Sequence, residues 1–209
     1  MGILKGAMTG RRYRVEGELP EGFRGPWIEA LNRGAFQEPF SASHRDETTG
    51  WVRPDNLLLT DFSDIGSWLF EPYAHFALRM DKKILPANLL KAKLRLAEEE
   101  WCGENQQRNC PASVRIELRE ALEVEMLTRC QPRVRVYEVL WQLHEGWLLF
   151  EGRSRHANEV FLKRFYQDFG RELSPVNPLD WLEDEPLRFA LERTGASEFN
   201  ESPAEVLHA

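Results

Sequence analysis

Residues 77–95 read ALRMDKKILPANLLKAKLR and concentrate side chains that can bind phosphate groups. The basic residues of this block are Arg79, Lys82, Lys83, Lys91, Lys93 and Arg95, and its one acid is Asp81. The whole chain has a net charge of −7, but contact with a polyanion depends on local charge. Lysine is a point charge on a flexible stem, which suits contacts to a phosphate backbone that read no base sequence. The predicted phosphate-binding residues are Lys82, Lys83, Lys91, Lys93 and Arg95.

A second basic set follows Pro132. Arg133 and Arg135 alternate with valines, so a strand over these residues presents both arginines on one face. We expect them to extend the phosphate-binding surface. The alternative for both sets is an ordinary solvated surface. Lys91 and Arg95 would then offset Glu98, Glu99 and Glu100 of their own helix, and the strand arginines would pair with acids on the 112–129 helix.

A nuclease is a second hypothesis from the same residues. Pro54-Asp55 and Asp81-Lys82-Lys83 match the loose PD-(D/E)xK pattern, in which two carboxylates hold Mg²⁺ and a lysine stabilises developing charge. No glutamate on an early helix is clearly placed to complete the metal shell. The five His and three Cys residues have no metal-ligand spacing either. We therefore predict a non-catalytic protein with no metal and no cofactor.

The elements that must position these residues alternate between strands and helices. We predict strands at 11–17, 50–54 and 67–85, helices after Pro20, at about 87–101 and at 112–129, a β-hairpin over 133–152, and a helix over 153–170. This order indicates an α+β fold: an antiparallel sheet with packed helices and a projecting long αα-hairpin at about 87–129.

The basic block begins on the longest predicted strand, whose two faces differ in composition. Ala74, Phe76, Leu78 and Met80 alternate and are predicted to face the core. The other face carries Tyr73, His75, Ala77, Arg79 and Asp81, and we expect it to be solvated. Pro86 lies where the next helix should begin, a position that tolerates its missing N–H.

Charge divides the chain into two parts. Between residues 168 and 209 there are ten acids and three bases, so this segment carries the entire net charge of −7. We predict one domain over 1–170 and an acidic, Pro-containing, partly disordered tail over 171–209. No window has the apolar length of a membrane span, and we expect a cytoplasmic protein.

A third hypothesis is a protein-interaction module without DNA binding. It rests on the acidic tail and on the acids of the predicted 112–129 helix, which could bind a basic partner. These acids are Glu117, Glu120, Glu123 and Glu125.

Several segments together resemble the recombination-associated protein RdgC family over residues 1–170. The resemblance lies in Gly50-Trp51-Val52, in Lys83-Ile84-Leu85-Pro86 between a strand and a charged helix, in the helices at 87–129, and in the hairpin and helix that follow. It implies sequence-indifferent DNA binding, a homodimer, modulation of RecA-dependent recombination with possible contact to RecA, and association with the nucleoid. Long members have a further C-terminal part and form a ring around duplex DNA, so this chain resembles a short form.

Overall fold

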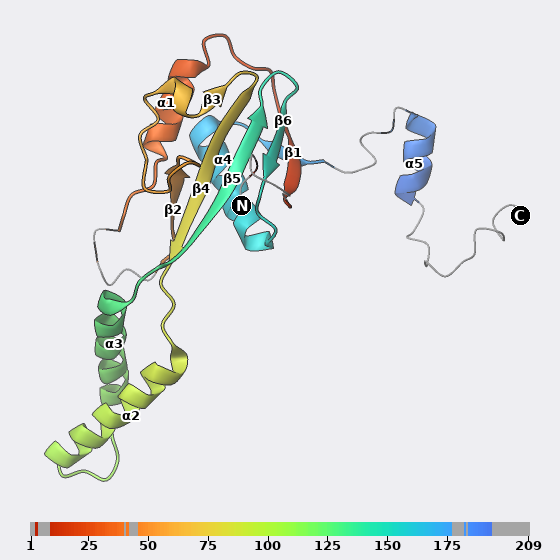
Figure 1. Cartoon of the computed structure of the whole chain (residues 1–209). Coiled ribbons are helices and arrows are strands. Elements are labelled where there is room, and N and C mark those ends of the chain that lie inside the picture. Colours follow the sequence, from red (N-terminus) through yellow and green to blue (C-terminus); the bar gives the residue numbers. More distant parts are fainter. Residues whose placement is uncertain are drawn as a thin grey trace, which may run out of the picture.

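A computed structural model describes residue 3 and residues 9–39, 41, 46–176, 182 and 184–193. The elements are β1 (Arg11–Val15), α1 (Arg24–Arg33), β2 (Thr48–Val52), a 3₁₀ turn (Ile65–Ser67), β3 (Leu69–Phe70), β4 (Tyr73–Lys82), α2 (Ala87–Glu104), α3 (Ala112–Arg129), β5 (Arg133–Gln142), β6 (Trp147–Phe150), α4 (Arg155–Phe169), β7 (Leu173–Pro175) and α5 (Glu185–Arg193). Seven strands form one sheet in the order β2-β4-β5-β6-β1-β7, with β3 also paired to β4. All of these strand pairs are antiparallel, which confirms the α+β class with an antiparallel sheet (Figure 1).

The centre of the sheet is the ladder between β4 and β5. These strands have ten residues each and pair along their whole length, from Tyr73 opposite Gln142 to Lys82 opposite Arg133. A turn at 143–146 then leads into β6, and its Gly146 has a φ of +66°, a value that a glycine adopts without strain. The β-hairpin predicted over 133–152 is confirmed.

Helix α4 covers one face of the sheet with an aromatic stripe. The Ser154 Oγ accepts a hydrogen bond from the Ala157 N–H at 3.1 Å, and Gly170 ends the helix at a φ of +64°. Between these caps, Phe161 and Phe165 are fully buried, and the Phe161 ring stacks on Phe150 of β6 at 4.0 Å. The helix predicted over 153–170 is confirmed.

Helices α2 and α3 pack against each other beyond the end of the sheet at which Lys82 and Arg133 lie (Figure 1). Two ion pairs join them, Arg115 to Glu98 at 2.7 Å and Lys93 to Glu125 at 3.6 Å. No residue of α2 is buried. The chain enters this helix pair through 83–86 and leaves it through 130–132, so both connections start from the β4–β5 ladder.

The expectation that the second face of β4 is solvated is wrong. His75, Arg79 and Asp81 are each only 6% exposed, although the opposite face also packs in the core as predicted. Two segments outside the main strands cover Arg79. Residues 34–36 pair with Trp51 of β2 and bring Phe36 onto this face, and the loop after β2 brings the Leu57 carbonyl to Arg79.

The sheet continues past residue 170, the predicted end of the domain. Strand β7 pairs with β1 through Leu173–Pro175, and helix α5 follows at Glu185–Arg193. The predicted disorder of the acidic tail falls mainly on 194–209, which lie outside the described residues. No helix among the described residues has the length and apolar character needed to cross a membrane.

Gly50 should be intolerant of any side chain, because a Cβ there would lie 2.3 Å from the Phe36 Cα. We expect Gly50→Ala to lower the free energy of unfolding by about 2 kcal/mol or more in urea titrations, since the backbone must move. Gly103 of α2 has nothing within 4 Å of such a Cβ. Gly103→Ala is the control and should raise stability by up to about 1 kcal/mol through helix propensity. Equal effects of the two changes would contradict the close packing of 34–36 on β2.

Candidate nucleic-acid interface

Three of the predicted basic residues lie together at the end of the β4–β5 ladder. Lys82 is directly opposite Arg133, and Arg135 is opposite Met80. Because side chains alternate along a strand, Lys82, Arg133 and Arg135 all point to the face that buries Met80. All three are exposed, and within the described part of the chain none of them forms an ion pair. The prediction that Arg133 and Arg135 share one face is confirmed.

Lys83 lies apart from this group, although it is adjacent to Lys82 in sequence. Lys83 is two residues after Asp81, on the side of the chain opposite to Lys82. Its Nζ donates a hydrogen bond to the Leu127 carbonyl at 2.8 Å. That carbonyl belongs to the last turn of α3, where carbonyl groups lack helical partners and favour a cation. Lys83 thereby fastens α3 to the end of β4.

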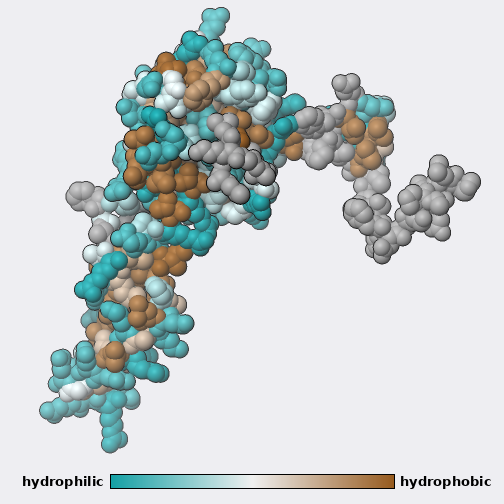
Figure 2. All heavy atoms as spheres, viewed as in Figure 1, coloured by the Kyte–Doolittle hydropathy of each residue, from teal (hydrophilic) through white to brown (hydrophobic). Residues whose placement is uncertain are grey.

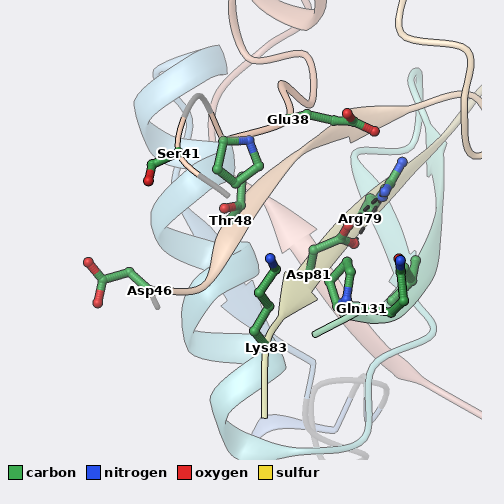
Figure 3. A pocket seen from close by; sticks show the side chains of 11 residues that line it. Glu38, Ser41, Asp46, Thr48, Arg79, Asp81, Lys83 and Gln131 are labelled. Carbon is green, nitrogen blue, oxygen red and sulfur yellow. Dashed lines mark hydrogen bonds and ion pairs between the residues drawn. The ribbon is translucent and has the colours of Figure 1, made fainter. Parts of the chain in front are cut away.

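A polar pocket of about 490 Å³ lies beside Lys83, at the base of the α2–α3 pair (Figure 3). Its lining residues are Glu38, Pro39, Ser41, Asp46, Thr48, Arg79, Asp81, Lys83, Gln131, Pro132 and Val134. Acids and bases are mixed in this lining, so the pocket does not form a positive surface.

Arg79 and Asp81 form a buried ion pair in the pocket wall. The Arg79 Nε donates to Asp81 Oδ1 at 2.9 Å and its Nη2 donates to Oδ2 at 2.6 Å. The guanidinium also lies 4.0 Å from the centre of the Phe36 ring and donates to the Leu57 carbonyl at 3.2 Å. Both oxygens of the Asp81 carboxylate are therefore committed to Arg79. Residues two apart on a strand share one face, so the sequence spacing of Arg79 and Asp81 could have indicated this ion pair.

The other carboxylate of the nuclease hypothesis, Asp55, has its own arginine. Arg53 donates to both Asp55 oxygens, at 3.1 and 2.9 Å, and these hydrogen bonds hold the pKa of the Asp55 carboxyl below its usual value. Asp55 and Asp81 are thus each neutralised separately. Across the described residues, no three His, Cys, Asp or Glu side chains gather as a metal site would require.

The cations of α2 divide into paired and unpaired residues. Lys93 approaches Glu125 of α3 at 3.6 Å. Lys91 and Arg95 are exposed, and among the described residues neither forms an ion pair, because Glu98 is bound by Arg115 instead. The alternative in which Lys91 and Arg95 offset the acids of their own helix is therefore not the observed arrangement for Glu98.

Two of the four acids proposed as an interaction surface on α3 form ion pairs with arginines. Glu123 is 7% exposed and binds Arg119 at 2.9 Å, and Glu125 lies 3.3 Å from Arg129. Glu117 and Glu120 are exposed. The acidic face is consequently smaller than the sequence suggested.

Comparison with known proteins gives one family. A family model described as "Putative exonuclease, RdgC" matches residues 25–189 of the 209-residue chain. No curated protein matches the sequence. The match begins in α1 and continues through the β4–β5 ladder, both helices between them, α4 and most of α5. The chain therefore belongs to the RdgC family.

Proposed function

We propose that this protein binds DNA without sequence preference, does not cleave it, and modulates homologous recombination. Membership of the RdgC family supports a role in recombination at the level of the family. The DNA contacts that we propose are Lys82, Arg133 and Arg135 at the ladder end and Lys91, Lys93 and Arg95 on α2. Contact with RecA and association with the nucleoid stay predictions of the resemblance.

The observation that carries the proposal is the placement of Lys82 opposite Arg133. Like charges on directly paired residues of an antiparallel ladder repel each other, which is unfavourable for folding. No acid among the described residues offsets either cation. An anion with regularly spaced charges, such as a nucleic-acid backbone, would remove the repulsion and bind both residues.

Helix α2 extends the same kind of surface away from the sheet. Lys91 and Arg95 are four residues apart, so they lie on one side of the helix, one turn from each other. Both residues would contact phosphate groups, and such contacts do not depend on the base sequence. Lys83 is left out of the proposed DNA contacts, because its amino group is bound to the end of α3.

The proposal that the protein is non-catalytic rests on the two arginine–carboxylate pairs. A carboxylate that binds Mg²⁺ needs free oxygen lone pairs directed at the ion. Both oxygens of Asp81 and both oxygens of Asp55 accept hydrogen bonds from guanidinium groups instead. Each guanidinium occupies one lone pair on each oxygen and places a positive charge beside the carboxylate, which disfavours a Mg²⁺ ion there.

We also propose that the protein is a homodimer through the α2–α3 pair. Four large apolar side chains on these helices are between 50% and 60% exposed, namely Leu89, Leu96, Ile116 and Val124. Figure 2 shows hydrophobic residues at the surface of this helix pair. Two helices that pack only against each other bury little apolar area. A second copy of the chain, related by a twofold axis, would cover these four side chains.

Removing the cross-strand cations should weaken DNA binding equally for all sequences. In the Lys82→Ala/Arg133→Ala variant, the slope of log affinity against log salt should become shallower by roughly two units, because two phosphate contacts are lost. Fluorescence anisotropy with labelled duplexes at several salt concentrations measures this. Folding stability should not fall, since the change also removes a repulsion.

The matched control removes two arginines from other parts of the surface. Arg24 and Arg53 are bound to Glu71 and Asp55, outside the proposed DNA contacts. The Arg24→Ala/Arg53→Ala variant has the same net charge as the test variant and should keep the parent salt slope. If both variants lose the same affinity and slope, binding follows net charge alone and the proposed surface is wrong.

The Asp81→Asn variant tests whether the Asp81 carboxylate stabilises the fold or takes part in catalysis. Removing the negative charge leaves Arg79 buried without its counter-ion, which should lower the free energy of unfolding by about 3–5 kcal/mol. Asp55→Asn is the control, because its side chain is 56% exposed whereas that of Asp81 is 7% exposed, and it should change stability by at most about 1 kcal/mol. An Asp81→Asn protein of parent stability, together with Mg²⁺-dependent DNA cleavage by the parent alone, would establish the nuclease instead.

The dimer predicts a solution mass of about 49 kDa, twice the 24.4 kDa of the chain. Light scattering at micromolar concentration should give this value for the parent. Leu89→Gln/Leu96→Gln should halve the mass, because polar groups then face the interface. Leu58→Gln changes a loop leucine that is 67% exposed and should leave the dimer intact. A monomeric parent would refute this interface.

A further inference from the structure

The face of the sheet opposite α4 carries a row of polar and aromatic side chains across five strands. The register aligns this row from β4 through β5, β6 and β1 to β7, and its members are Tyr73, Gln142, Trp147, Arg14 and Ser174. The neighbouring row includes Arg12, opposite Leu149 of β6. Both rows are separate from the cations proposed above, which lie on the other face at the far end of the β4–β5 ladder.

Described helices do not cover this part of the sheet. Phe161 and Phe165 of α4 and Trp27 of α1 belong to the aromatic core on the opposite face, and Figure 1 shows α4 behind the strands. On the near face, the Ile3 N–H donates to Glu138 at 2.8 Å. Glu138 lies four residues before Gln142 on β5, so this contact is two rows away.

Two aromatic rings form the centre of the row. The Tyr73 and Trp147 ring centres are 6.2 Å apart, with the rings steeply inclined to each other. Tyr73 is 36% exposed and Trp147 is half-buried. The Trp147 indole N–H donates to Glu145 at 2.6 Å, which fixes the orientation of the ring. The protein thus holds an oriented aromatic pair on a part of the sheet that no described helix covers.

Cations border this aromatic pair. The Arg12 guanidinium lies 5.0 Å from the centre of the Trp147 ring, and Arg14 is exposed on the strand beside Trp147. Three acids on or next to the neighbouring strands have partners. Glu145 accepts from the Trp147 indole, and Glu16 accepts from the Ser174 hydroxyl at 2.8 Å. Glu138 binds His75 at 3.0 Å. Aromatic rings flanked by arginines on an open antiparallel sheet are the arrangement that suits unpaired bases and their phosphates.

We propose that this face binds single-stranded nucleic acid. Bases stack on Trp147 and Tyr73, and the adjoining phosphates contact Arg14 and Arg12. Arg12 lies against the Trp147 ring at a position that a base can take, and its displacement would direct the guanidinium to a phosphate. Every base has a π face, so the site discriminates unpaired from paired bases and not one base sequence from another. The proposal adds a second surface to the DNA-binding function proposed above and can fail independently of it.

The test uses the full chain and a labelled oligothymidylate of about 16 nucleotides, long enough to span one such site. Trp147→Leu keeps apolar cover on the sheet but removes the π face, and we expect affinity for the single strand to fall about tenfold. Tyr73→Leu and Arg14→Gln should each weaken binding less. Tyr166→Leu is the control, because Tyr166 is 55% exposed on α4, far from this row, and it should bind like the parent.

Two further probes assign the cause. An abasic oligomer of the same length keeps the phosphates but offers no bases, so it should bind the parent weakly and respond little to Trp147→Leu. A blunt duplex should bind Trp147→Leu as it binds the parent, while Lys82→Ala/Arg133→Ala should lose duplex affinity. Thermal unfolding monitored by circular dichroism verifies that each variant is folded.

The outcomes are separable. Loss of single-strand affinity in both Trp147→Leu and Tyr73→Leu, with unchanged duplex affinity, supports the stacking surface even if the ladder-end cations prove irrelevant. Parent-like single-strand binding by both folded variants overturns the proposal, whatever the duplex result. Equal losses for the oligothymidylate and the abasic oligomer also overturn it, because the contact would then be to phosphates alone.

Discussion

The pairing of β4 with β5 over ten residues is the constraint on which the rest of this structure depends. One face of the ladder supplies the floor of the aromatic core under α4, and the other holds the Arg79–Asp81 ion pair. The chain leaves the far end of β4 into α2 and returns from α3 into β5. The helix pair is therefore an insertion between two strands that remain hydrogen-bonded neighbours. The register of this ladder therefore sets the positions of Lys82, Arg133 and Arg135.

Burial of both faces of β4 fixes that register. A slip of one residue would turn Arg79 and Asp81 into the aromatic core and place Phe76 and Leu78 on the face that now holds the ion pair. A buried ion pair adds little to the free energy of unfolding compared with apolar residues of similar size. Moving its two charges into an apolar core without their partners would cost their full desolvation energy. We infer that the polar face of β4 contributes specificity of pairing more than stability. The same register brings Lys82 opposite Arg133, so the cation pair at the ladder end follows from the ion pair inside it.

Local patterns were sufficient to predict the elements whose partners are near in sequence. The helix α4 and the β5–β6 hairpin each follow from spacing and turn chemistry within about twenty residues. The burial of Arg79 could not be predicted in this way, because Phe36 and Leu57 reach it from loops. Neither loop has a periodic pattern, and only tertiary contact reveals which face they cover. The contact of Lys83 could not be predicted for a similar reason: its partner, the Leu127 carbonyl, is 44 residues away and belongs to the backbone.

The distribution of charge in this protein resolves the apparent conflict between an acidic chain and a nucleic-acid partner. Three acids of α2 and α3, namely Glu98, Glu123 and Glu125, are paired with arginines or a lysine across or along the helices, which reduces the negative potential that a ligand experiences there. The cations of the ladder end and of α2 that form no ion pair with described residues are Lys82, Arg133, Arg135, Lys91 and Arg95, and the local potential around them governs encounter with an anion. Net charge therefore describes how the molecule repels other copies of itself at a distance, whereas ligand contact depends on which charges the fold leaves without partners.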